Sequence, residues 1–580
     1  MMHTWAPAGA TSNLNEHARR NCSGGKIASI IQRFAYEGYS MRRLMTACAA
    51  LALTACDADT GLHTEETATD AASAESYAAE GWTAKTLPEI AAGLQAGAVS
   101  AEDLVTAYLE RIERVDRAGP TLQSVIAVNP NALDDARAAD AALAAGQSLG
   151  PLHGVPILLK DNIETKDPLA TTAGALALKD NVTGRDSPLV AGLRDAGAII
   201  LGKTNLSQWA NFRSNNSMSG WSALGGQVKN PHMLDRNPCG SSSGSGAAMA
   251  ASLAAGTVGT ETNGSIICPS NVNGVVGFKP TVGLVSQQHI VPISSSQDTA
   301  GPMTKTVTGA AMMLNAMATG GTGTDYTAAL EDNAFDGARI GVLRFSLNDN
   351  EDINAAFEAA LAMMEENGAT LVNIEEFEPQ AENFWGKARD VLNYEFKATI
   401  NEYLADAAPA VDTRDLDALI AFNEANADVE LALFDQSIFE TAAPLAGLDN
   451  DNYITARDDV QSATRENGID ALMTENDVDI LVSPSGVLAP RVDPINGDVW
   501  PQWAGGGWLA AIAGYPHATV PMGSVHGLPI GISFMGAKDD DANVLYFAYS
   551  YEQRTNHRID PQYLTSAEDR SEVAAAMKQK

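Results

Sequence analysis

Histidine and metal-binding motifs are scarce in this chain. Nine histidines occur in 580 residues, and three of them, His3, His17 and His63, precede the part that we expect to fold. No H-E-x-x-H motif and no cysteine spacing typical of zinc sites is present, so metal-dependent hydrolysis is not predicted. A lone histidine such as His289 or His517 is more often structural than catalytic.

Positive charge is also in short supply. The chain has 37 Lys and Arg against 72 Asp and Glu, which gives a net charge of −35. Nucleic acid and anionic membrane surfaces repel such a chain, so we expect no nucleic-acid partner and attribute the charge to solubility. Aromatic residues make up only 6% and hydrophobic residues 45%, which is compatible with an alanine-rich globular enzyme.

An apolar segment near the N-terminus is too short to span a bilayer. Residues Leu44–Ala55 follow Arg42 and Arg43 and end just before Cys56. A basic start, a short apolar core and small residues at the end are typical of secretory signal peptides. We therefore predict a signal peptide over residues 41–55, with an uncleaved apolar anchor as the alternative.

The residues around the predicted cleavage point resemble a bacterial lipobox. In Leu53-Thr54-Ala55-Cys56, the cysteine would carry the lipid and become the first residue of the mature chain. We expect translation to begin at Met41, which makes residues 1–40 an upstream mis-annotation. The resemblance implies an exported protein that a lipid at Cys56 anchors in the bacterial cell envelope, facing the periplasm.

The stretch from residue 56 to residue 80 carries almost no large apolar side chains. It is acidic and rich in threonine and alanine, a composition that cannot bury a core. We therefore predict a disordered tether there.

Five cysteines occur, and the predicted processing leaves Cys239 and Cys268 in the folded part. An oxidising compartment would allow these two to form a disulfide. We expect instead two small buried thiols, each beside a serine-rich loop.

Short apolar runs alternate with helical stretches from residue 81 onward. Thr86-Leu87-Pro88-Glu89 has the form of a capping box, and Ala132–Ala145 is an alanine-rich helix. Helices between short buried strands predict an α/β fold, in which helices cover both faces of a central mixed, largely parallel sheet. The predicted strands are Val155–Leu159, Ala198–Leu201, Val275–Phe278, Ile340–Leu343, Ile480–Val482, Ala518–Val520 and Ile530–Phe534.

Strand signals fade between about residues 375 and 466. Acidic helical patterns such as Val391–Leu404 take their place. We predict a helical insertion that borders the substrate entrance, with a plain structural layer as the alternative.

The most distinctive stretch is Pro238–Thr281. Two loops rich in serine and glycine, with Ser241 in the first and Ser265 in the second, flank the run Ala247–Ala255, for which we predict a helix. Upstream, Lys160 ends an apolar run. Two hydroxyls and a lysine at the end of a buried strand can activate a nucleophile without histidine. No G-x-S-x-G elbow surrounds Ser265.

These motifs resemble those of the amidase signature family. The resemblance covers about Gly81 to His557, and bacterial peptide amidases, which remove C-terminal amides from peptides, are the members that the chain resembles most. It implies one large amidase domain over residues 81–570, which cleaves amide bonds through an acyl-enzyme without a cofactor. The motifs are Gly240-Ser241-Ser242-Ser243-Gly244, Gly264-Ser265-Ile266, Gly277-Phe278-Lys279-Pro280-Thr281 and GVPILLKDN.

The resemblance implies a Ser-cisSer-Lys triad of Lys160, Ser241 and Ser265, with Ser265 as the nucleophile. Lys160 must be neutral to accept a proton, and burial lowers the pKa of a lysine. Lys279 is a rival base after another buried strand, but the family pattern gives it no catalytic role. Backbone N–H groups before the nucleophile are expected to stabilise the oxyanion. The residues of this turn are Thr262, Asn263, Gly264 and Ser265, and Ser242 and Asp298 are expected as supporting residues.

The residues after Ser265 indicate which amides the site accepts. Many family members carry an arginine two or three places after the nucleophile, where it can hold a substrate carboxylate. Here Ile266, Ile267 and Cys268 follow, and Asn263 stands where peptide amidases carry aspartate. We therefore expect neutral substrates, such as C-terminal peptide amides or aryl and alkyl amides, in preference to small acids that bear an amide.

Two other functions fit parts of the pattern. One is the glutamine-amidase subunit of a tRNA-dependent amidotransferase, but the export signal and the charge of −35 oppose work beside tRNA in the cytosol. The other is a non-catalytic periplasmic binding lipoprotein, which the intact set of one lysine and two serines opposes.

Overall fold

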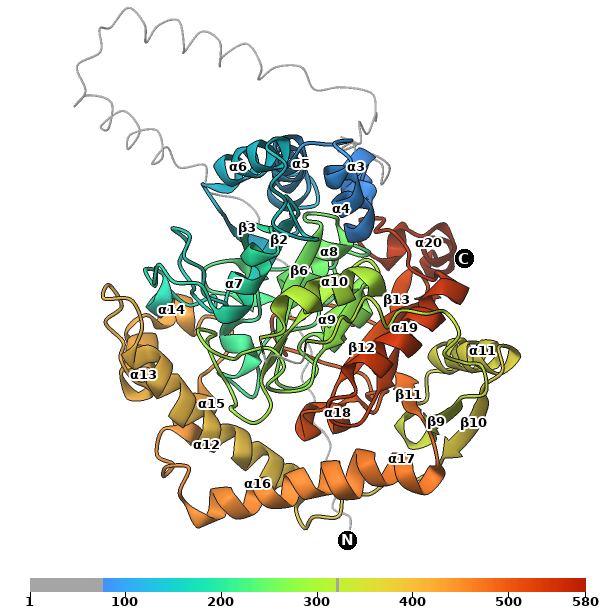
Figure 1. Cartoon of the computed structure of the whole chain (residues 1–580). Coiled ribbons are helices and arrows are strands. Elements are labelled where there is room, and N and C mark those ends of the chain that lie inside the picture. The colour runs from blue at the N-terminus through green and yellow to red at the C-terminus, as the bar shows by residue number, and fades with distance from the viewer. Residues whose placement is uncertain (1–76, 320–322, 580) are drawn as a thin grey trace, which may run out of the picture. The chain divides into compact units, whose positions relative to one another are not determined.

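Each predicted apolar run forms part of a strand in the central sheet. The computed structural model describes residues 77–319 and 323–579. The predictions for residues 1–40, 41–55 and Cys56, and the tether prediction for residues 57–76, therefore lie outside it. The sheet has eleven strands in the order β1-β3-β2-β6-β8-β7-β12-β13-β11-β9-β10 (Figure 1). Their bounds are β1 Val125–Val128, β2 Pro156–Lys160, β3 Ile199–Thr204, β6 Gly256–Glu261, β7 Val276–Lys279, β8 Thr299–Thr304, β9 Arg339–Leu343, β10 Thr370–Ile374, β11 Ile480–Pro484, β12 His517–Val525 and β13 Leu528–Met535.

Strand directions make the sheet a mixed one. Strands β3, β2 and β6 run parallel to one another, as do β11, β9 and β10. Between these blocks, neighbouring strands from β6 to β11 are antiparallel, and β1 is antiparallel to β3. A separate two-stranded ribbon pairs β4, Trp221–Ser222, with β5, Gly226–Gln227.

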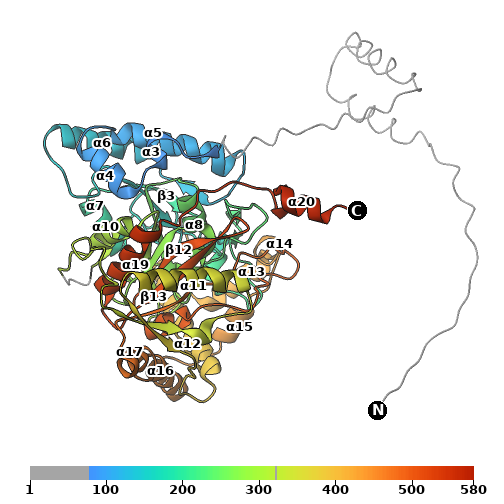
Figure 2. The same ribbon diagram turned by 90° about the vertical axis from the view of Figure 1, so that its right-hand side faces the viewer.

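Helices cover both faces of the sheet, as the α/β pattern predicts. Helices α10 and α19 pack against each other on one side of the sheet, and α8 lies on the other side (Figure 2). Helix α8 packs against α9. The helices outside residues 375–466 are α3 Gly81–Ala84, α4 Leu87–Gln95, α5 Ala101–Arg111, α6 Ala132–Ala144, α7 Pro188–Asp195, α8 Ser243–Ala250, α9 Ile267–Asn273, α10 Val307–Met317, α11 Glu351–Glu366, α17 Asp470–Asn476, α18 Gly507–Ala513, α19 Asp541–Thr555 and α20 Ser571–Met577. Short π or 3-10 turns are η2 Ile112–Arg117, η3 Leu176–Leu178, η4 Gln208–Asn211, η5 Arg344–Ser346 and η7 Ala567–Asp569.

The helix expected over Ala247–Ala255 begins and ends earlier. Helix α8 ends at Ala250, and Ser252 then adopts a left-handed conformation with φ 58°. A left-handed residue just past the last turn is a common helix terminator. The chain is thereby free to enter β6 at Gly256, a strand that the apolar pattern does not reveal.

Residues 375–466, for which the sequence predicts a helical insertion, contain helices and no strand. In both views, α12 and α16 lie at the opposite end of the folded part from α5 and α6 (Figures 1 and 2). The helices are α12 Phe384–Ala405, α13 Leu416–Ala425, α14 Ala427–Glu430, α15 Ser437–Ala442 and α16 Asp451–Thr464, followed by the π-helical η6 Arg465–Ile469.

The last residues of the predicted tether pack onto the fold. The Arg111 guanidinium donates hydrogen bonds to the backbone carbonyls of Tyr77 and Ala78. The Tyr77 ring packs edge-on against Tyr563 with 5.8 Å between centroids. The folded part therefore includes residues 77–80, which composition alone assigns to the tether. Among the described residues, no helix is both long enough and apolar enough to cross a membrane.

Candidate active site

Lys160 is the last residue of β2 and is completely buried. The preceding residues Ile157, Leu158 and Leu159 are apolar and equally buried, so the strand carries the ammonium group into the interior. Its Nζ donates hydrogen bonds to Ser241 Oγ at 2.8 Å and to Ser242 Oγ at 3.0 Å.

Burial also changes the protonation of Lys160. Removal from water disfavours the ammonium and lowers the pKa of Lys160 from 10.5 to about 7. The negative charges of Asp298 and Glu261 partly oppose this lowering. Thr260 on β6 accepts two further hydrogen bonds from Nζ, at 2.9 Å through its hydroxyl and at 3.3 Å through its carbonyl. A lysine in this setting can act as a base near neutral pH.

The first serine loop presents Ser241 to this lysine. The Gly240–Ser241 peptide bond is cis, as the family resemblance implies. A side chain at Gly240 would place its Cβ 2.1 Å from Ser207 Oγ, so any larger residue would force Ser207 to move. Ser242 Oγ donates to the Thr260 carbonyl at 3.0 Å and accepts the Thr260 N–H at 3.1 Å. Ser242 therefore fastens the loop to β6.

The second serine loop connects β6 to α9 and carries Ser265, which is 8% exposed. The Ser242 N–H donates to the Ser265 carbonyl at 3.1 Å, which brings the two loops together. No hydrogen bond joins the Ser265 hydroxyl to Ser241 or to any other described residue. Catalytic hydrogen bonds are often completed only when substrate is bound.

The turn before Ser265 leaves backbone donors free. Within the described part of the chain, the N–H groups of residues 262–265 donate to no protein acceptor. The next two N–H groups, of Ile266 and Ile267, donate to the Glu261 carboxylate at 2.7 and 3.0 Å. The donors of the turn, with Gly264 at φ 79°, are thus available to a developing oxyanion.

Asp298 supports this turn from behind. It accepts hydrogen bonds from the Thr262 hydroxyl at 2.5 Å and from the N–H groups of Ile293 and Ser294 at 2.7 and 3.0 Å. Burial raises the pKa of Asp298 to about 6.

The helical insertion contacts the segment just before Asp298 through a carboxylate that the sequence pattern does not identify. Glu395 on α12 is fully buried and accepts hydrogen bonds from the Ser294 hydroxyl and from the Ser296 N–H, the latter at 3.1 Å. Its other oxygen accepts the Tyr453 hydroxyl of α16 at 2.8 Å. The insertion thereby helps to hold the segment that contains Asp298.

The rival groups are engaged elsewhere. Lys279 Nζ donates to the Pro280 carbonyl at 3.2 Å, and burial lowers its pKa to about 8, but among the described residues it bonds to none of the candidate serines. His517 is buried and within hydrogen-bond distance of the Ser533 hydroxyl at 2.6 Å. Burial lowers the pKa of His517 to about 3, so its ring is neutral at physiological pH.

A cavity of about 580 Å³ adjoins both serine loops through Gly240, Asn263 and Gly264. Its charged lining residues are the carboxylates Glu261 and Asp498, and no Lys or Arg lines it in the part of the chain that the structure describes. Aromatic side chains from distant segments form much of its wall, which the sequence pattern does not predict. They are Phe345, Trp385, Trp500, Trp503 and Trp508.

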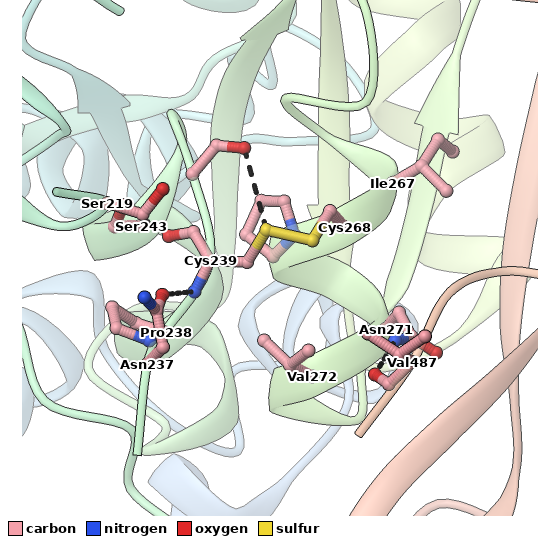
Figure 3. Close-up of a disulfide and its surroundings, with 12 residues drawn as sticks. Ser219, Asn237, Pro238, Cys239, Ser243, Ile267, Cys268, Asn271, Val272 and Val487 are labelled. Carbon is pink, nitrogen blue, oxygen red and sulfur yellow. Dashed lines mark hydrogen bonds between the residues drawn. A yellow bond between two sulfur atoms is a disulfide. The ribbon is translucent and has the colours of Figure 1, made fainter. Parts of the chain in front are cut away.

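The expectation of separate thiols at Cys239 and Cys268 is wrong, because the two form a disulfide (Figure 3). They are 29 residues apart in sequence, but folding brings their Cα atoms to 5.9 Å, within the range that a disulfide spans. Close packing of the two serine loops creates this proximity, which spacing along the sequence does not reveal.

Comparisons with known proteins identify the family of the chain. Residues 103–545 match the sequence profile of the Amidase family. The chain is 36% identical over 502 residues to Probable amidase At4g34880 of Arabidopsis thaliana, covering 83% of this chain and 91% of the relative. It is 33% identical to a glutamyl-tRNA(Gln) amidotransferase subunit of Halorhodospira halophila, covering 82% of this chain and 99% of that protein.

A solved structure shows the same fold. The native peptide amidase from Stenotrophomonas maltophilia superposes with a TM-score of 0.78 at 44% identity, covering 83% of this chain and 98% of that chain. The family profile spans most of the folded part, including both serine loops. The chain therefore belongs to the amidase signature family and is an amide-hydrolysing enzyme.

Proposed function

We propose that the enzyme hydrolyses neutral carboxamides through an acyl-enzyme on Ser265, with Ser241 as proton relay and Lys160 as base. The observation that carries this proposal is the 2.8 Å hydrogen bond between a lysine with a pKa of about 7 and Ser241 Oγ. Hydroxyls are weak nucleophiles at neutral pH, so such a base is required.

The steps follow from this arrangement. Ser265 Oγ attacks the carbonyl carbon, its proton moves to Ser241 Oγ, and the Ser241 proton moves to neutral Lys160 Nζ. Return of a proton by the same route to the amide nitrogen releases ammonia or an amine and leaves the ester on Ser265. Water, deprotonated through the relay, then releases the acid and restores the serine.

The turn before the nucleophile stabilises the charge that develops on the carbonyl oxygen. The N–H groups of Thr262, Asn263, Gly264 and Ser265 are the candidate donors, and each well-placed donor contributes a few kcal/mol. The bond between the Thr262 hydroxyl and Asp298 fixes the start of this turn before substrate arrives. Preorganised donors need no rearrangement during the reaction.

The cavity lining favours neutral acyl groups over carboxylates. Glu261 and Asp498 are its charged lining residues, and Glu261 Oε1 is buried without a hydrogen-bond partner among the described residues. A substrate carboxylate would lose water and meet like charge, which is unfavourable. C-terminal peptide amides with apolar side chains suit the aromatic wall, and the similarity to a peptide amidase supports this class.

The same lining argues against glutamine as the substrate. Glutamine carries an α-carboxylate, and a buried carboxylate requires a cationic partner such as arginine. Despite the similarity of the chain to glutamyl-tRNA(Gln) amidotransferase subunits, this lining does not favour glutamine as its substrate.

We further propose that the enzyme is an envelope lipoprotein anchored through Cys56. The lipobox resemblance motivates this location, and the disulfide supports it, since disulfides persist in oxidising compartments such as the periplasm.

The test is a panel of amides assayed for ammonia release. A capped dipeptide amide is compared with a free-carboxylate monoamide of similar size and with glutamine, each by kcat/KM. We expect the dipeptide amide to be preferred by at least about tenfold. Equal values, or a preference for either acid, would contradict the assignment of neutral substrates.

A further inference from the structure

The disulfide joins the two loops that carry the proposed catalytic serines. Cys239 lies two residues before Ser241, and Cys268 lies three residues after Ser265. Figure 3 shows the bond running from the loop of Pro238 to the first turn of α9. Within the described residues it is the single disulfide.

Few hydrogen bonds fix the position of these two loops relative to each other. The Ser242 N–H donates to the Ser265 carbonyl at 3.1 Å, and Asn273 Nδ2 donates to the Pro238 carbonyl at 3.0 Å. Because the Ser265 hydroxyl bonds to no described residue, its position relative to Ser241 depends on the backbone of both loops.

The bridge is also built into its surroundings. The Cys239 N–H donates to Asn237 Oδ1 at 2.8 Å, and the Cys239 carbonyl accepts the Ser243 hydroxyl at 2.5 Å. Cys239 takes a left-handed φ of 55°, which is uncommon for a residue with a side chain. The backbone just before Ser241 is thus fixed from several directions.

Both cysteines of the disulfide also lie at the substrate cavity. Cys239 and Cys268 are 5% and 4% exposed and both line the cavity. They form an apolar cluster with Val272 and Ala489, against which Trp500 of the cavity wall packs.

We propose that the Cys239–Cys268 disulfide is a positioning bridge for amide hydrolysis, which holds Ser241 and Ser265 at the separation that proton transfer requires. This rests on the roles assigned under Proposed function. Reacting groups must be held within about 0.5 Å, and a displacement of about 1 Å can cost about a hundredfold in rate. The sulfurs take no part in the chemistry, so loss of the bridge lowers kcat far more than it changes KM.

Reduction opens the bridge without changing the sequence. A thiolate of dithiothreitol attacks one sulfur, and the S–S electron pair passes to the other sulfur, which takes a proton. The second thiol of the reagent then displaces the first sulfur, leaving two protein thiols and a cyclic disulfide of the reagent. We expect kcat for a capped dipeptide amide to fall about ten- to hundredfold and to recover on reoxidation.

Variants of the full chain separate the bridge from the individual side chains. If the bridge acts as a unit, Cys239→Ser, Cys268→Ser and the double variant lose kcat equally, and dithiothreitol affects only the wild type. The matched control is Val272→Ala, which removes apolar packing beside the bridge and leaves the bond intact. Its kcat is expected to match the wild type, and KM is expected to change by less than about threefold in all variants.

Hydrogen exchange of the backbone amides in residues 239–245 and 262–268 gives a readout that does not need turnover. Faster exchange in the double variant than in Val272→Ala would support the positioning role of the bridge. This result would hold even if the oxidised wild type released no ammonia, because the absence of ammonia release would contradict only the proposed function. Unchanged kcat in wild type whose free thiols are verified by mass would overturn the inference. Additive losses in the single variants, or exchange equal to that of the control, would do the same.

Discussion

The proposed base titrates near neutral pH, so the pH profile of the enzyme reports its protonation directly. Burial lowers the pKa of Lys160 from 10.5 to about 7. This lowering corresponds to about 5 kcal/mol of disfavour for the buried ammonium. At pH 7 about half of the Lys160 side chains are neutral, against about 3 in 10,000 for an ordinary lysine.

Protonation removes the proton acceptor, so activity is lost on the acid side. We expect kcat/KM for a capped dipeptide amide to fall about tenfold per pH unit below about pH 7 and to level off above it. The assay is the initial rate of ammonia release between about pH 5 and pH 9, in buffers of constant ionic strength. Lys160→Met should abolish activity across the whole range.

Lys305 supplies a matched control for this experiment. It is 5% exposed, and burial lowers its pKa to about 7, the same value as for Lys160. Its Nζ donates to the backbone carbonyls of Thr83, Ala84 and Lys85 rather than to a serine. Lys305 directly follows the six-residue strand β8, and Asp298 directly precedes it. About 20 Å of strand therefore separates Lys305 from Asp298 at the candidate site. The fall in kcat/KM below about pH 7, the acid limb of the profile, should therefore be unchanged in Lys305→Met.

Replacement of Asp298 should also shift the pH profile. Its negative charge raises the pKa of Lys160, so Asp298→Asn should move the acid limb to lower pH even though loss of support for Thr262 lowers the rate. An acid limb with a midpoint near pH 10 would refute the burial of the base. A limb that disappears in Lys305→Met would show that another group controls the profile.

Three further predictions follow from the site. Ser265→Ala should abolish turnover and Ser241→Ala should cost several orders of magnitude, with the double variant no slower than Ser265→Ala, because the groups act as one unit; independent, additive losses in kcat would argue against a relay. Ile267→Arg places a cation on the cavity wall and should raise kcat/KM for free-carboxylate monoamides relative to neutral amides, whereas an unchanged ratio would show that the lining does not set this preference. Mass spectrometry of the membrane fraction should find a mature chain that begins with lipidated Cys56, and an intact segment before Cys56 would count against processing.

The sequence predicts those parts of the fold that depend on local apolar patterns. All seven apolar runs coincide with strands, although three of the runs begin one residue before the strand does. The helices of residues 375–466 match the loss of strand signals there. Strand β6, Gly256–Glu261, is missed because its glycines and threonines do not resemble a buried strand, although every residue in it is buried. Its burial depends on neighbouring strands and helices, which local composition does not encode.

The residues of the candidate site also fall into those that local sequence predicts and those that it does not. Lys160 and the serine loops are recognisable because each forms a compact motif, whereas Glu395 and Trp500 reach the site from segments far along the chain. The disulfide is the clearest case, since Cys239 and Cys268 become neighbours only through packing of the two loops. Tertiary proximity of this kind cannot be obtained from spacing or propensity.

The most direct test of the account is the identity of the acylated residue. The wild-type enzyme is mixed with an activated p-nitrophenyl ester of a capped amino acid, quenched in acid and mapped by peptide mass spectrometry. We predict one acyl group on the peptide that contains Ser265, absent in Ser265→Ala. Acylation of Ser241 or Ser242 instead, or acylation that persists in Ser265→Ala, would contradict the assignment of the nucleophile.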